Sequence, residues 1–284
     1  MTKRMALADG MLLLTAMIWG LAFVVVKNTV ETIPPAQMVT MRHAIAAALT
    51  ALLFGKQLRG LTRWDVARGA LIGTVLGLAY CIQTDALRYT TAGKNAFLTT
   101  LYVLLVPVLG ALFLGMRLHR RTLGSAALMF LGIALLSLGD VTGGLNRGDV
   151  LTLLCSVFYA IHILLIERYQ KRTDVRALVV LQFAFCALVS FFWQMLFEGR
   201  PVPLTQGSLG GLLYLAVISS TLGISLQNIG QSMTRSDHAV VLLSLESVFG
   251  ALGGIVLLGE QVTPVMGVGF GMIFGSLLLN ELCP

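Results

Sequence analysis

The chain has 284 residues, of which 57% are hydrophobic and only 12% are charged. A soluble domain carries about 25% charged residues, so this composition excludes an ordinary soluble protein and favours one that crosses a membrane many times. The net charge of +7 does not indicate nucleic-acid binding, because the basic residues lie in short loops between apolar stretches, where they orient the chain in the bilayer.

Apolar stretches recur along the whole chain, and each is close to the roughly 20 residues that a helix needs to cross a bilayer. Helices are expected because lipid offers no water to unpaired backbone groups. The first stretch follows a basic N-terminus but has no small-residue cleavage site before Lys27, so we interpret it as an uncleaved span. The predicted spans are 9–27, 36–54, 66–88, 93–115, 122–139, 149–167, 176–197, 208–232, 237–259 and 265–282.

The distribution of Lys and Arg predicts how these ten spans are oriented. With the N-terminus in the cytoplasm, 14 of these residues lie on the inner side and 5 on the outer side, and Arg42 lies within a span. This bias predicts that both termini are cytoplasmic. The four cysteines lie in or at the ends of spans, so we interpret them as small apolar residues and expect no disulfide.

The two halves of the chain align with each other. Residue n matches n + 140 near the two starts, where Asp9 meets Asp149. The offset grows to 144 further on, where the segment 83–98 matches 227–242 and Gln83 meets Gln227. Few residues are identical, but one alignment with small offset changes runs through both halves.

This alignment predicts two five-span repeats, residues 1–140 and 141–284, in one all-α membrane-embedded unit. Because five is an odd number, the second repeat must enter the membrane upside down. Inverted repeats are typical of secondary transporters, whose substrate site lies near the midplane between the repeats. The alternative is an old duplication within a membrane enzyme or scaffold.

Three motifs follow one another along the chain: "IWG" in the first span, an arginine in the second, and "LESVF…LLGEQVTP" in the ninth and tenth. With these residues the chain resembles the EamA family of the drug/metabolite transporter superfamily over essentially its full length. The resemblance implies ten helices around a central cavity and export of amino acids or other small metabolites from bacteria. Two positions depart from the family pattern. Met116 stands where the family has a glutamate, and Ser247 stands where it has a proline. Without the proline, the sequence does not decide whether the ninth span is kinked.

An acid, Glu246, lies inside the apolar run of the ninth span. An acid at the centre of a membrane helix costs about 2.5–3.5 kcal/mol, so it is expected to face a cavity or a partner. One interpretation is contact with a substrate amine or coupling to a proton. The other is a hydrogen bond to a neighbouring helix that holds the bundle together.

Arg42 and His43 lie near the centre of the second span, about 100° apart on the helix. Arg42 could bind a substrate carboxylate by a bidentate contact, or form an ion pair with Glu246 or Asp85. His43, and His162 in the sixth span, can titrate near physiological pH and are candidates for proton coupling. A lone histidine in a helix bundle is more often a hydrogen-bonded packing residue.

Amides and aromatic rings complete the predicted site. Gln83 and Gln227 suit either an uncharged hydrogen-bonding site or plain contacts between helices. Aromatic side chains gather at central depth, where they predict either a cavity for small amphipathic ligands or helix packing. The aromatic residues are Trp19, Phe23, Tyr80, Tyr102 and Tyr159. Tyr102 matches Glu246 across the repeat.

The sequence motifs that mark several other classes of protein are absent. There is no GxxxxGK[ST], so we expect no nucleotide to drive the protein, and no motif indicates a metal or a cofactor. Glycines at every fourth position of the last span are interpreted as packing, with a dimer through that span as the alternative to a monomer. The prediction is a secondary transporter, not an enzyme, that exports small metabolites, with amino acids leading. A membrane enzyme acting on lipid-like substrates and a passive channel are the alternatives.

Overall fold

The computed structural model describes residues 3–115, 120–138, 145–234 and 236–282, and these residues form helices and short connections without any β-strand. Met116, Cys283 and the predicted boundary between residues 140 and 141 lie outside the described residues.

Seven helical elements precede residue 139 and eight follow residue 144. The first set is α1 (Lys3–Thr29), α2 (Pro35–Phe54), the 3₁₀ turn η1 (Gly55–Leu58), α3 (Arg63–Ala86), α4 (Ala92–Thr99), α5 (Tyr102–Leu114) and α6 (Arg120–Leu138). The second set is α7 (Arg147–Tyr169), α8 (Val175–Phe197), α9 (Gln206–Leu213), the π-helix η2 (Tyr214–Ile224), α10 (Ser225–Gln231), α11 (Ser236–Ser244), α12 (Glu246–Leu258) and α13 (Pro264–Leu282).

Eight helical segments of the described chain are long and apolar enough to cross a membrane. They correspond to predicted spans one to four and six to nine. The fifth and tenth predicted spans fall on α6 and α13. Within α13, the segment Pro264–Ser276 is apolar but shorter than the eight membrane-crossing segments. Large apolar side chains around the bundle stay exposed, among them Leu52, Phe113 and Val256. A bilayer covers such a surface, so the chain is a multi-pass membrane protein.

The helix ends follow local sequence signals. At the start of α7, the Asn146 side chain accepts a hydrogen bond from the Asp149 N–H, and the Asp149 carboxylate accepts one from the Asn146 N–H. This reciprocal capping pairs two backbone donors that the first helical turn leaves free. Helices α5 and α12 end at Gly115 and Gly259, whose φ angles of 68° and 67° favour glycine.

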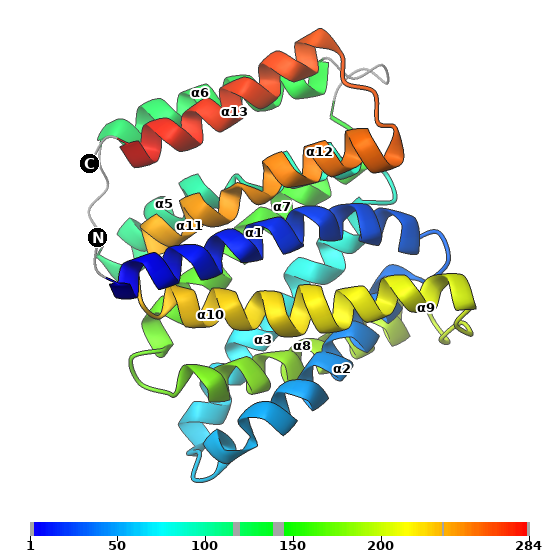
Figure 1. Ribbon diagram of the computed structural model, residues 1–284, viewed down its shortest axis with the longest axis vertical. Helices are drawn as coiled ribbons and strands as arrows, with labels where there is room; N and C mark the ends of the chain where they lie inside the picture. The colour runs from blue at the N-terminus through cyan, green and yellow to red at the C-terminus, as the bar shows by residue number, and fades with distance from the viewer. Residues whose placement is uncertain (1–2, 116–119, 139–144, 235, 283–284) are drawn as a thin grey trace.

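The helices form a layered bundle (Figure 1). α6 and α13 pack side by side along one edge, and α2, α3 and α8 pack together along the other. α1 lies between, against α12 and α10. α1 begins and α13 ends at the same end of the bundle (Figure 1).

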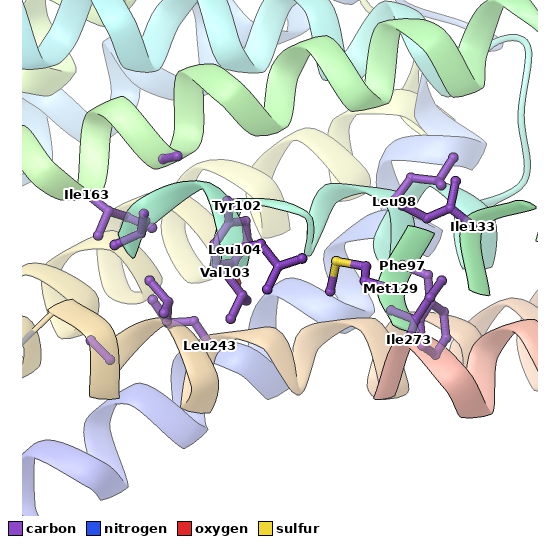
Figure 2. Close-up of a cluster of buried hydrophobic side chains, with 14 of the residues drawn as sticks. Phe97, Leu98, Tyr102, Val103, Leu104, Met129, Ile133, Ile163, Leu243 and Ile273 are labelled. Carbon is purple, nitrogen blue, oxygen red and sulfur yellow. The ribbon is translucent and has the colours of Figure 1, made fainter. Parts of the chain in front are cut away.

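One apolar cluster joins the α6–α13 pair to the centre (Figure 2). Met129 and Ile133 of α6 and Ile273 of α13 lie there beside Phe97 and Leu98 of α4. The Phe97 ring also stacks on the Phe270 ring of α13, with 4.2 Å between the ring centroids. These contacts fix α4 and α5 from outside, so their other face is free to line the centre.

The fourth and ninth predicted spans are each interrupted within their length. The backbone tightens to i→i−3 hydrogen bonds around Thr100–Leu101 and around Leu245. Hydroxyls contribute, because Thr100 donates to the carbonyl of Phe97 and Ser247 donates to that of Ser244. Such side-chain bonds compete with the helical ladder, so the ninth span is interrupted although it lacks the proline. A 3₁₀ stretch inside a helix often marks a hinge.

Candidate functional site

A central cavity lies between the helices, with about 660 Å³ of empty volume including the part that opens to solvent. All nine residues predicted to bind substrate lie on its wall. They are Trp19, Phe23, Arg42, Tyr80, Gln83, Tyr102, Tyr159, Gln227 and Glu246. His162 also lines it, whereas His43 does not. Their role in binding stays a prediction.

Arg42 projects from α2 and is 1% exposed. Its Nε donates to Ser220 Oγ and its Nη2 to Ser219 Oγ, both at 2.9 Å, and the guanidinium lies 4.7 Å from the centre of the Tyr80 ring. Neither Glu246 nor an aspartate of the described chain forms an ion pair with it. Among the described residues, the guanidinium is therefore a buried cation whose partners are all neutral.

The serines that hold Arg42 come from the π-helix η2, which the sequence analysis did not identify. Within it, the Thr221 hydroxyl donates to the Ala216 carbonyl at 2.8 Å, and the Trp19 indole N–H donates to the Ser219 carbonyl at 3.1 Å. π-helical segments are rare and frequent at functional sites. The local signal in the sequence was a run of three hydroxyl residues, Ser219, Ser220 and Thr221, after an apolar stretch.

Glu246 is the first residue of α12, directly after the interruption, and is 4% exposed. Its Oε1 accepts a hydrogen bond from the Tyr102 hydroxyl at 3.1 Å. Tyr102 is likewise the first residue of α5 after the other interruption. The two residues that match across the repeat therefore meet at the cavity, each at a half-helix N-terminus, where the helix dipole favours negative charge.

The two predicted glutamines differ in their surroundings. Gln83 Nε2 donates to Thr99 Oγ1 at 3.1 Å, and its Oε1 accepts from the Tyr159 hydroxyl at 2.6 Å. Gln227 is 2% exposed, and its Oε1 has no hydrogen-bond partner among the described residues. A buried amide oxygen without a partner costs free energy unless a ligand or water supplies a donor.

The two histidines are both buried. His162 Nε2 lies 2.9 Å from Gln182 Oε1. His43 Nδ1 lies 2.8 Å from the Val39 carbonyl, and its Nε2 is buried without a partner among the described residues. The His43 ring packs against Tyr80, with 4.8 Å between ring centroids. Of the two, only His162 is placed to exchange a proton with the contents of the cavity.

Aromatic rings form the remaining wall. Tyr80 and Tyr159 meet edge to face with centroids 5.7 Å apart, and Trp19 and Phe23 line the cavity from α1. Within the described residues, no group of three or more His, Cys, Asp or Glu side chains could hold a metal ion. The cavity can accept a small ligand with an apolar body, one anionic end at Arg42 and further hydrogen bonds at its glutamines and Glu246.

Comparison with known proteins gives one family. The family model described as the EamA-like transporter family matches the chain twice, over residues 6–138 and 146–282. An uncharacterized transporter of Archaeoglobus fulgidus is 34% identical over 276 residues, which are 97% of this chain and 86% of that protein. A protein of Salmonella typhimurium named a probable amino-acid metabolite efflux pump is 26% identical over 292 residues, covering 97% of this chain and 95% of that protein.

A protein of Pseudomonas aeruginosa named a probable biotin transporter is 26% identical over 254 residues, covering 83% of this chain and 87% of that protein. A solved structure, titled only as the crystal structure of a protein, superposes with a TM-score of 0.74 at 17% identity and covers 97% of this chain and 96% of its own. That likeness shows the fold alone.

Proposed function

Since the chain belongs to the EamA-like transporter family, we propose that this transporter exports small metabolites that carry a carboxylate, with amino acids as the leading class, by alternating access. The observation that carries the substrate class is the buried guanidinium of Arg42 on the cavity wall. A relative of this chain, named a probable amino-acid metabolite efflux pump, agrees with that class.

The Arg42 side chain ends in a guanidinium, which is a cationic group with five N–H donors. A buried charge without a counter-charge is costly, and two serine hydroxyls and a ring face compensate it only in part. Nη1 has no hydrogen-bond partner among the described residues. A substrate carboxylate on the free edge of the guanidinium supplies the missing negative charge and a geometry that suits the fork of donors.

The other polar groups of the cavity fit the rest of an amino acid. Glu246 faces the cavity at the start of α12, where it either contacts the substrate amine or carries a coupled proton. The aromatic wall of Trp19, Phe23, Tyr80 and Tyr159 offers apolar area for a side chain. Biotin, named for one relative, also carries a carboxylate on an apolar chain, so Arg42 serves that alternative cargo equally.

For the architecture we propose ten spans in two inverted repeats, residues 1–140 and 141–284, with both termini in the cytoplasm and the chain in the bacterial inner membrane. The helix bounds support this, because α5 matches α12 residue for residue at an offset of 144. The double family match supports it as well. Two interrupted spans that meet at a central cavity are typical of carriers in which one repeat rocks against the other.

The test is uptake by purified protein in liposomes. Labelled amino acids are compared with two matched analogues of each: the amine that lacks the carboxylate and the amide that replaces it with a neutral group. We expect saturable uptake of the acids and little uptake of either analogue. Equal uptake of acid and amine would contradict the role of Arg42 in choosing the substrate.

The role of Glu246 is decided in the same vesicles. Uptake is measured for wild type and Glu246→Gln with and without an imposed pH gradient. Loss of the gradient effect with retained uptake of the amino acids supports proton coupling, and loss of amino-acid uptake with and without the gradient supports substrate contact. If the variant keeps both uptake and its gradient dependence, Glu246 only holds helices together through Tyr102.

A further inference from the structure

Two acid–base pairs lie at opposite ends of α1. Lys94 Nζ is 2.7 Å from Asp149 Oδ2, and His238 Nε2 is 2.9 Å from Asp9 Oδ1. The first pair lies at the C-terminal end of α1. There, Lys27 donates a hydrogen bond to the carbonyl of Thr90, and the Thr90 hydroxyl donates one to Asp149. Asp9 precedes Lys27 by 18 residues in the same helix, which is about 27 Å at 1.5 Å per residue.

The two pairs are copies of each other under the internal repeat. Asp9 matches Asp149 at the offset of 140, and Lys94 matches His238 at the offset of 144. Each pair also joins the two repeats. Lys94 of the first repeat binds Asp149 of the second repeat, and His238 of the second repeat binds Asp9 of the first repeat. One repeat is therefore tied to the other at both ends of the bundle by the same kind of contact.

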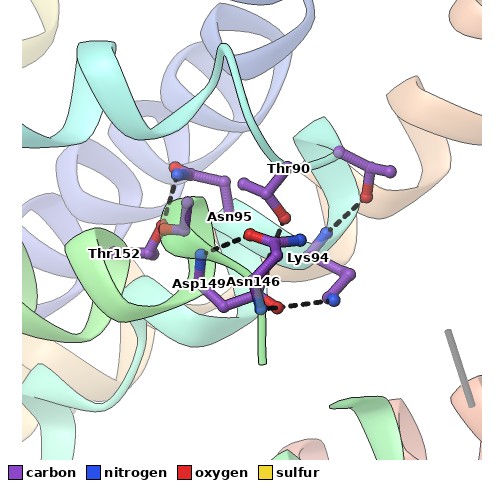
Figure 3. Close-up of polar contacts among 8 residues, drawn as sticks. Thr90, Lys94, Asn95, Asn146, Asp149 and Thr152 are labelled. Carbon is purple, nitrogen blue, oxygen red and sulfur yellow. Dashed lines mark hydrogen bonds and ion pairs between the residues drawn. The ribbon is translucent and has the colours of Figure 1, made fainter. Parts of the chain in front are cut away.

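The two pairs differ in how tightly they are enclosed. The Lys94 and Asp149 side chains are 1% and 0% exposed, and Thr90 and Asn146 add hydrogen bonds to the Asp149 carboxylate (Figure 3). The side chains of His238 and Asp9 are 34% and 23% exposed.

A further contact between the repeats lies at the Asp149 end. Glu260, after α12, accepts hydrogen bonds from the N–H groups of Ala92 and Gly93 at the start of α4, at 2.6 and 3.0 Å. The matching position of the first repeat holds Met116, which has no carboxylate to offer. The end at Lys94–Asp149 therefore has the more enclosed of the two pairs and also the Glu260 contact.

We infer that Lys94–Asp149 and Asp9–His238 are positioning residues of the transport cycle: each pair holds the two repeats together at one mouth of the cavity and separates when that mouth opens. This inference rests on the proposed alternating access. A buried pair is costly to separate unless water reaches both charges, and opening a mouth supplies that water. The tighter pair shifts the population toward the state that is closed at the Asp149 end.

The experiment measures which face of the membrane reaches the cavity. Cys81, Cys155, Cys186 and Cys283 are replaced by alanine, and Thr84, on the cavity wall, becomes the single reporter as Thr84→Cys. A membrane-impermeant maleimide is applied to vesicles of either orientation, and the rate of labelling is recorded from each face. No substrate is needed.

In the reporter background we expect faster labelling from the Asp9 face. Lys94→Gln should raise labelling from the Asp149 face severalfold and lower it from the other, and the exchanged pair Lys94→Asp with Asp149→Lys should move both rates back toward their original values. His238→Lys, which gives the Asp9 pair a permanent charge, should shift labelling in the same direction as Lys94→Gln. The matched control is Arg147→Gln, because Arg147 forms an exposed pair with Asp85 at the same end, 3.7 Å apart.

Unchanged labelling rates in folded Lys94→Gln and His238→Lys would overturn the inference, as would an equal shift in Arg147→Gln. If Lys94→Gln does not fold, His238→Lys and His238→Gln alone decide it, and they should shift labelling in opposite directions. If the variants shift labelling but the protein takes up no amino acid, the proposed substrate class would be contradicted, whereas the inferred role of the two pairs would be supported.

Discussion

Replacing Arg42 tests the substrate site most sharply, because its charge and its partners are both defined. In Arg42→Gln the serine hydroxyls of η2 lose their donor, but no buried charge is left alone, since the guanidinium had only neutral partners. The lost contact with the Tyr80 ring costs about 0.5–2 kcal/mol. The variant is therefore expected to fold.

Binding should suffer more than folding. Hydrogen bonds to a charged group contribute about 1.5–3 kcal/mol, and each 1.4 kcal/mol is a factor of about ten in affinity. Arg42→Gln should therefore weaken binding of a carboxylate substrate by about 10- to 150-fold. Arg42→Lys should lie between, because an ammonium keeps the charge but lacks the planar fork.

The assay is equilibrium binding of a labelled acid and of the matched amine that lacks the carboxylate, in detergent. The loss of affinity should be confined to the acid, and Arg147→Gln, an exposed arginine, should bind both ligands as wild type does. An equal loss for both ligands would show that Arg42 shapes the cavity without contacting the carboxylate, and no loss would refute the site.

Three further changes and one control test contacts between the helices, each by unfolding in detergent. Tyr102→Phe removes the hydrogen bond to Glu246 and should lower stability by about 1 kcal/mol; unchanged stability would mean the bond contributes nothing. Gly20→Ala should cost about 1–3 kcal/mol, because the added Cβ would lie 2.9 Å from the Glu246 carbonyl oxygen. Gly10→Ala, on the same helix with open space, should instead gain about 0.5–1 kcal/mol, and equal effects would contradict the close approach. Glu260→Gln should cost about 0.3–1 kcal/mol and speed hydrogen exchange in the first turn of α4, while exchange elsewhere in α4 should not change.

Much of the cavity was predictable because polar groups are conspicuous in apolar spans. Arg42 and Glu246 stand out by their cost in a membrane, and both lie on the cavity wall. The repeat alignment also placed Tyr102 against Glu246, and the structure joins them by a hydrogen bond. Such predictions need only local composition and one internal alignment.

Other features depend on contacts that local sequence does not encode. The serines that hold Arg42 are 177 and 178 residues away from it, and nothing in "YLAVISSTLGI" distinguishes a π-helix from an α-helix. We expected Arg42 to pair with a substrate, or else with Glu246 or Asp85; neither acid contacts it. Counting charges put Lys94 on the outer side, but the count could not reveal that its ammonium is buried against Asp149.

Counterflow in liposomes tests the central claim, carriage by alternating access, most directly. Vesicles are loaded with a high concentration of an unlabelled amino acid and diluted into a trace of the labelled form. A carrier whose site faces one side at a time should accumulate label transiently above its external concentration, and Arg42→Gln should abolish this. Label that only equilibrates across the membrane, without the transient, would identify a passive pore and contradict the account.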